Sequence, residues 1–149
     1  MLAEDLDVSM FDDAHTVQSR GPFLCCQQVL REMRERGSGT ILFTGVPQSL
    51  GGTPKGLPNS VSKAGARGLA QVLAGEYSRF GVHVAHVIIN GVVQSPGTAD
   101  LAFARAKPEL QMDTAAVAET FWQLHAQHST VWTHEVVISP GASQLASRL

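Results

Sequence analysis

Cysteine, aromatic residues and excess charge of one sign are all scarce in this sequence of 149 residues. The only cysteines are Cys25 and Cys26, and an adjacent pair makes no disulfide framework. The simplest interpretation is a reducing, cytoplasmic setting. A formal net charge of -2 excludes the basic footprint of a nucleic-acid-binding protein. No apolar run approaches the ~18 residues that span a bilayer. We therefore expect neither nucleic acid nor a membrane as a partner.

Metal ligands and hydrolase motifs are also in short supply. His125 and His128 are three residues apart near a predicted helix end, but no third ligand has suitable spacing. His83 and His86 are three apart on a predicted strand, so they point to opposite faces and cannot share an ion. No G-x-S-x-G nucleophile elbow is present. We expect no metal site and no serine hydrolase.

The sequence does contain an alternation of helical and strand-like segments. With 44% hydrophobic and 16% charged residues, it has the composition of a soluble globular domain, and we expect residues 1–149 to form one domain. Short apolar runs at residues 40–44, 82–89 and 132–138 are typical of buried parallel strands. Helical patterns separate them. This alternation predicts an α/β fold with a parallel sheet.

Three helices are expected around these strands. In the first, Ser9 opens a possible capping box and Pro22 predicts a kink or a restart. Its periodic positions are Phe23, Cys26, Leu30 and Met33.

The second helix should cover residues 59–80 with Asn59 as its amino-terminal cap. Small residues on this helix, Gly65 and Gly68, indicate close helix contact. Asp113 or Thr114 should cap the third helix, whose inward positions are Val117, Phe121 and Leu124.

Several motifs resemble the short-chain dehydrogenase/reductase family in their order and spacing. They lie at residues 21–24, 39–45, 62–65, 81–84 and 132–135, and read Gly-Pro-Phe-Leu, Gly-Thr-Ile-Leu-Phe-Thr-Gly, Ser-Lys-Ala-Gly, Gly-Val-His-Val and Trp-Thr-His-Glu. The resemblance covers nearly the whole chain. It implies a doubly wound sheet and an NAD or NADP cofactor. No Gly-x-x-x-Gly-x-Gly or Gly-x-Gly-x-x-Gly run follows a strand in these residues, so the resemblance implies a partial Rossmann-like three-layer fold that lacks the amino-terminal dinucleotide-binding half.

The resemblance also assigns the four catalytic positions of the family. Lys63 matches the catalytic lysine, although the alternative interpretation is an ordinary surface lysine. The tyrosine position is Asn59, the serine position is Val46 and the asparagine position is Gln18. An amide at Asn59 cannot supply the titratable proton of a phenol. These replacements imply that most of the catalytic machinery is lost.

For the cofactor, the resemblance assigns Lys63 together with Gly91, Val93 and Ser95. Ser95 keeps the hydroxyl of a threonine that contacts the carboxamide in the family. Without the phosphate cradle, cofactor binding by these residues alone is not expected.

The side of the sheet on which the third helix lies separates two expectations. Right-handed crossovers, which account for about 98% of cases, would place all three helices on one face. The family resemblance implies a left-handed last crossover, which places Val117 and Leu124 on the opposite face. We follow the resemblance.

Three functional hypotheses remain open. The first is an NAD(P)-dependent oxidoreductase-class protein that is inactive as an isolated chain. The second is a non-catalytic oligomerisation module, in which helices 22–36 and 59–80 form the interface that the resemblance implies. The third is one half of a split oxidoreductase completed by a separate amino-terminal half.

Overall fold

The computed structural model describes residues 2–141, and it has a parallel three-stranded sheet in the order β1-β2-β5. The strands are β1 (Gly39–Gly45), β2 (Val82–Ile89) and β5 (Glu135–Ile138). Gly39 pairs with Val82 at the start of the first ladder, and His86 pairs with Glu135 at the start of the second. The predicted α/β class and strand order are confirmed. Residues 1 and 142–149, which the single-domain expectation included, lie outside the described residues.

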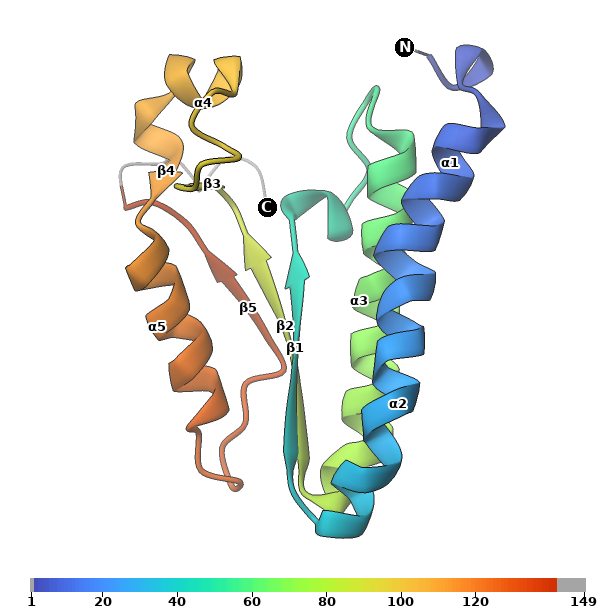
Figure 1. The fold of residues 1–149 in the computed structure, drawn as a ribbon, viewed down its shortest axis with the longest axis vertical. Coiled ribbons are helices and arrows are strands. Elements are labelled where there is room, and N and C mark those ends of the chain that lie inside the picture. Colours follow the sequence, from blue (N-terminus) through green and yellow to red (C-terminus); the bar gives the residue numbers. More distant parts are fainter. Residues whose placement is uncertain (1, 142–149) are drawn as a thin grey trace.

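Helices cover both faces of this sheet (Figure 1). The α-helices are α1 (Val8–His15), α2 (Gly21–Arg36), α3 (Leu57–Tyr77), α4 (Ala102–Ala106) and α5 (Thr114–His125). Figure 1 shows α2 and α3 on one side and α5 on the other, which confirms the placement that the resemblance implied. The two crossovers, from β1 to β2 and from β2 to β5, move in the same direction across the sheet. Because α3 and α5 lie on opposite faces, the two crossovers must have opposite hands.

A π-helical segment, Thr16–Arg20, joins α1 to α2 and explains how the chain passes Pro22. Proline has no backbone N–H, so it cannot donate to the carbonyl of Gln18 four residues earlier. The wider turn occurs where that bond is lost, and α2 restarts with Pro22 in its first turn. The predicted restart is confirmed, and Gly37 ends α2 with a left-handed φ of 71°.

Two of the expected helix caps are wrong. Asp7, rather than Ser9, caps α1, because its carboxylate accepts a hydrogen bond from the Ser9 backbone N–H at 2.9 Å. The helix α3 begins at Leu57, so Asn59 lies inside its first turn and does not cap it. At α5 the cap is Asp113, whose side chain accepts from the Ala116 N–H.

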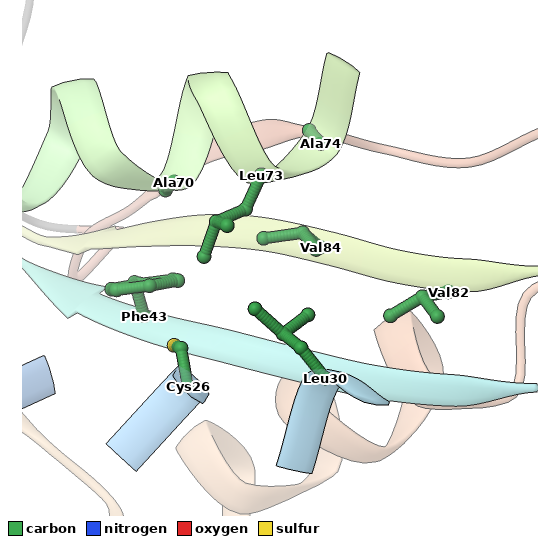
Figure 2. Close-up of a cluster of buried hydrophobic side chains, with 8 residues drawn as sticks. All are labelled: Cys26, Leu30, Phe43, Ala70, Leu73, Ala74, Val82 and Val84. Carbon is green, nitrogen blue, oxygen red and sulfur yellow. The ribbon is translucent and has the colours of Figure 1, made fainter. Parts of the chain in front are cut away.

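The core lies between the sheet and the helices α2 and α3. Figure 2 shows side chains from both helices converging on the faces of β1 and β2. Its members are Cys26, Leu30, Phe43, Ala70, Leu73, Ala74, Val82 and Val84. None of them comes from β5 or α5. This cluster therefore joins β1 and β2 to α2 and α3 alone, whereas Val117 and Leu124 of α5 are also buried but do not belong to it.

The third strand begins later than residue 132, because side chains take the hydrogen bonds that a longer ladder would use. The Thr133 N–H donates to the side-chain oxygen of Gln127 at 2.8 Å, and its carbonyl lies 2.9 Å from a ring nitrogen of His83. Trp132 stacks on the same imidazole with centroids 4.9 Å apart. Regular pairing with β2 starts only at Glu135.

The connection after β2 contains small elements that the sequence did not predict. The short strands β3 (Val92–Val93) and β4 (Gln111–Met112) pair in parallel, with α4 between them.

Single-turn 3-10 helices lie along the whole chain, at Ala3–Asp5, Pro47–Ser49, Ser78–Phe80 and Pro108–Leu110. No helix within residues 2–141 is long and apolar enough to cross a membrane.

Candidate functional site

Lys63 lies at the carboxyl end of β1. It projects from α3, and its ammonium group donates a hydrogen bond to the backbone carbonyl of Thr44 at 3.1 Å. The side chain is half-buried, and this burial lowers the pKa of Lys63 below its ordinary value. Parallel α/β sheets bind ligands at this end of their strands. Lys63 therefore lies at the end of the sheet where the family resemblance predicts a cofactor-binding lysine.

A pocket of about 370 Å³ surrounds this lysine and is formed by the π segment, α2, β1 and α3. Gln18, at the position of the family's asparagine, lines the same pocket, and its side-chain oxygen is buried without a hydrogen-bond partner. The pocket also contains both thiols, Cys25 and Cys26. The structure thus brings together Gln18 and Lys63, which are distant in the sequence.

The other two catalytic positions do not line this pocket. Val46 follows β1 directly, and its carbonyl accepts hydrogen bonds from the N–H and hydroxyl of Ser49 at 2.8 and 2.6 Å. Asn59 is half-buried in the first turn of α3. Neither a valine nor an asparagine side chain can act as a general acid or base near neutral pH. The positions expected for the family's serine and acid therefore carry no acid–base chemistry.

Gly91, Val93 and Ser95 belong to a second, separate region around β3. The lining of its pocket, about 300 Å³ in volume, includes Ser95 and Thr98 and shares no residue with the pocket around Lys63. The Thr98 hydroxyl donates to the Val93 carbonyl at 2.7 Å and lies 3.1 Å from the Ser95 hydroxyl. Ser95 is exposed and tied to its own turn.

Local packing alone explains why position 91 is a glycine. A Cβ at Gly91 would lie 2.7 Å from the Met112 sulfur and 2.8 Å from the Leu110 carbonyl. The glycine therefore lets β3 approach β4, and close approach of a cofactor is not needed to account for it.

These residues do not fit a whole dinucleotide. Lys63 and the buried Gln18 oxygen offer polar contacts for one sugar-sized group. Ser95 lines a different pocket, and Gly91 and Val93 belong to the same segment of the chain. No Gly-x-x-x-Gly-x-Gly or Gly-x-Gly-x-x-Gly run follows a strand in residues 2–141. The helix amino terminus that normally receives a pyrophosphate is thus missing from the described residues. We derive no reaction step through the cofactor.

A charged cluster on the α3 side of the sheet was missed by the sequence interpretation. Arg67 binds Glu135 through two hydrogen bonds of 2.6 and 2.8 Å, and the same carboxylate lies 3.1 Å from Nδ1 of the buried His86. Hydrogen bonds from Arg67 hold the pKa of Glu135 below its ordinary value. Arg67 and Glu135 are 68 residues apart, so only the strand register brings the cluster together.

Comparison with known proteins assigns the chain to a family. The model of the short chain dehydrogenase family matches residues 2–105, which is more than half of the sequence. The chain therefore belongs to the short-chain dehydrogenase family, as the motifs around Lys63 implied.

Two curated relatives support this membership. The chain is 32% identical over 106 residues to an uncharacterized oxidoreductase of Thermotoga maritima and 34% identical over 97 residues to levodione reductase of Leifsonia aquatica. These matches cover 71% and 62% of this chain. The chain spans only 42% and 34% of the length of those relatives.

A solved structure agrees with the sequence relatives. A short-chain dehydrogenase from Rhodopseudomonas palustris superposes with a TM-score of 0.76 and 28% identity. The superposition covers 94% of this chain and 56% of that protein. The described sheet and helices thus correspond to part of a complete short-chain dehydrogenase fold.

Proposed function

We propose that this chain is a protein of the NAD(P)-dependent oxidoreductase class that does not catalyse hydride transfer by itself. Family membership supports the class. The observation that supports inactivity is the site itself, in which Lys63 has kept its place while the proton-donor position is Asn59. Loss of general acid–base help typically lowers the rate ~10²–10⁴-fold.

Cofactor affinity should limit the isolated chain before proton transfer does. The cofactor carries out hydride chemistry, and the protein must bind and orient it. Lys63 can contact one part of a dinucleotide, whereas the part of the chain that the structure describes, residues 2–141, contains no Gly-rich fingerprint to cradle the pyrophosphate. A separate amino-terminal half that carries a Gly-rich turn is the complementing partner that we propose for NAD or NADP binding.

A turnover assay with rebuilt catalytic positions tests whether cofactor binding limits the isolated chain before proton transfer does. We expect no carbonyl reduction with NADH or NADPH by wild-type chain or by the Val46→Ser/Asn59→Tyr double variant, because binding fails in both. Addition of an amino-terminal half from a family member is the change expected to give activity. Turnover by wild-type chain that Lys63→Ala abolishes would show that the site is active and uses a different acid.

An oligomerisation module is the second function that we propose, and an exposed apolar face of α3 favours it. Val61 and Val72 are 46% and 55% exposed. Gly68, between them, has open space where a Cβ would lie. A helix face of this kind can pack closely against another helix. A second copy, meeting this one through helices 22–36 and 59–80, is the partner that we propose.

Light scattering at high micromolar concentration tests the oligomer. We expect a dimer or larger assembly for wild-type chain and a smaller species for Val72→Asp, because a carboxylate would be buried in the interface. Val131→Asp is the matched control, since Val131 is 71% exposed in the loop before β5. A monodisperse wild-type monomer would contradict this proposal.

A further inference from the structure

The cluster of His86, Glu135 and Arg67 joins three elements through one carboxylate. His86 lies on β2 and is only 1% exposed, whereas Glu135 begins β5 and Arg67 projects from α3. Arg67 donates to both carboxylate oxygens, and Oε2 also meets the His86 imidazole. The Glu135 carboxylate thus connects the central strand β2, the edge strand β5 and the covering helix α3.

The state of the carboxylate determines the tautomer of His86. Because Arg67 stabilises the ionised form of Glu135, this carboxylate can only accept a hydrogen bond, and the Nδ1–H of His86 must donate it. The second ring nitrogen, Nε2, is then unprotonated. It is buried, has no hydrogen-bond partner and faces Gly45, where an added Cβ would come within 2.1 Å of it.

Protonation at Nε2 would therefore create a buried N–H with no acceptor. The elements packed around the ring supply Arg67 and Lys63 from α3, which repel an imidazolium, and Glu135 from β5, which attracts it. The strand β1 contributes Phe43 and Gly45, which are uncharged. Burial is the largest effect and lowers the pKa of His86 below 6.5, so the cluster favours the neutral ring.

His86 also sits where β5 joins the sheet. Its backbone N–H donates to the His134 carbonyl at 2.9 Å, and it forms the first of only four residue pairs between β2 and β5. The hydrophobic core shown in Figure 2 includes no residue of β5 or α5. Loss of this first pair would loosen β5 while leaving the core in place.

We propose that His86 is an acid-sensitive latch, whose protonation releases β5 and α5 from the sheet while β1, β2, α2 and α3 stay folded. The neutral ring holds the Glu135 carboxylate and the first rung of the ladder. The charged ring cannot remain between Gly45 and α3 without an unpaired N–H and two repelling cations. The latch does not depend on the proposed oxidoreductase function.

The pH window follows from proton linkage. In the closed state β5 is paired with β2, and in the open state this pairing is lost. A histidine whose pKa is lower in the closed state binds its proton more tightly in the open state. The closed state is fully favoured above pH 6.5, the ordinary value, and loses this advantage as the pH falls through the lower pKa of the closed form. For one proton, the opening constant rises by up to about tenfold per pH unit in that window.

Hydrogen exchange measured between pH 7.5 and pH 5 tests the latch. After correction for the intrinsic exchange rate at each pH, we expect amides of residues 135–138 to lose protection up to about tenfold per pH unit below pH 6.5. Amides of residues 39–45 should keep theirs. Equal loss in both strands, or no loss in β5, would overturn the proposal.

The variant His86→Asn separates titration from structure. Asparagine can still donate to Glu135 from the position of Nδ1, but it does not titrate, so the selective loss in β5 should disappear. His15→Asn is the control, because His15 is exposed on α1, and it should behave as wild type.

Nitrogen NMR of the wild-type imidazole keeps the proposal testable if the variant fails to fold. We expect the Nδ1–H tautomer at pH 7.5 and a midpoint below 6.5. An Nε2–H tautomer, or a midpoint at or above 6.5, would refute the latch.

Discussion

Replacement of Gly45 by alanine tests the close packing between β1 and the buried imidazole of His86. A Cβ at position 45 would lie 2.1 Å from Nε2 and 2.5 Å from Cε1 of His86. Real Cβ contacts are not this short, so the ring or the strand must move. The ring is held on its other side by Glu135 at 3.1 Å. Overpacking a core typically costs 1–3 kcal/mol, and we expect Gly45→Ala to lose about 3 kcal/mol.

Urea unfolding of a double-mutant cycle measures this cost and assigns it to the contact. In a His86→Ala background the methyl group has space, so Gly45→Ala should cost less than about 0.5 kcal/mol, giving a coupling of 2 kcal/mol or more. Gly51→Ala is the control, because nothing lies within 4 Å of its added Cβ; it should be neutral or up to about 1 kcal/mol more stable. Equal costs in both backgrounds would refute the proposed contact.

Three further predictions concern the core, a helix cap and the charged cluster. Leu73→Ala should lower the free energy of unfolding by about 2–5 kcal/mol in urea, because Leu73 is 6% exposed in the core, whereas Val131→Ala, at a position 71% exposed, should change it by less than about 0.5 kcal/mol. Asp113→Ala should cost about 1 kcal/mol in thermal unfolding and Asp113→Asn much less, since only alanine removes the acceptor for the Ala116 N–H; equal melting temperatures would contradict the cap. Glu135 has a lowered pKa because Arg67 donates to it, so the stability that it contributes is complete above pH 4.5 and is lost as the pH falls through the folded value; Glu135→Gln should flatten this acid limb, and an unchanged slope between pH 5 and pH 3 would contradict the assignment.

The parts of the fold that could be predicted are those in which local sequence and packing agree. The strands β1 and β2 are short segments rich in apolar and β-branched residues, so both were predicted within a residue of their bounds. The start of β5 was not, because the residues before Glu135 bond to Gln127 and His83, which pattern cannot reveal. At α3 two signals compete. Asn59 is a common cap residue, but Pro58 before it suits a first helical turn, and the helix begins earlier.

The candidate site was predictable only where a family motif fixes the residue. Lys63 follows from the Ser-Lys-Ala-Gly motif, and Gln18 from its offset in the same pattern; the structure places both in one pocket. Ser95, to which the resemblance assigned the position of a family threonine, is bonded within its own turn. His86 belongs to no motif that we identified. Glu135 ends the Trp-Thr-His-Glu motif, but that motif gave it no role, and it meets His86 only because two parallel strands adopt one register.

Calorimetric titration of the purified chain with NADH and NADPH measures whether the isolated chain binds a dinucleotide. We predict a dissociation constant weaker than about 1 mM for both cofactors, equivalent to less than about 4 kcal/mol of binding free energy, and no difference between wild type and Lys63→Ala. Micromolar binding that Lys63→Ala weakens at least tenfold would contradict it, because the pocket around Lys63 and Gln18 would then hold the dinucleotide without a phosphate cradle.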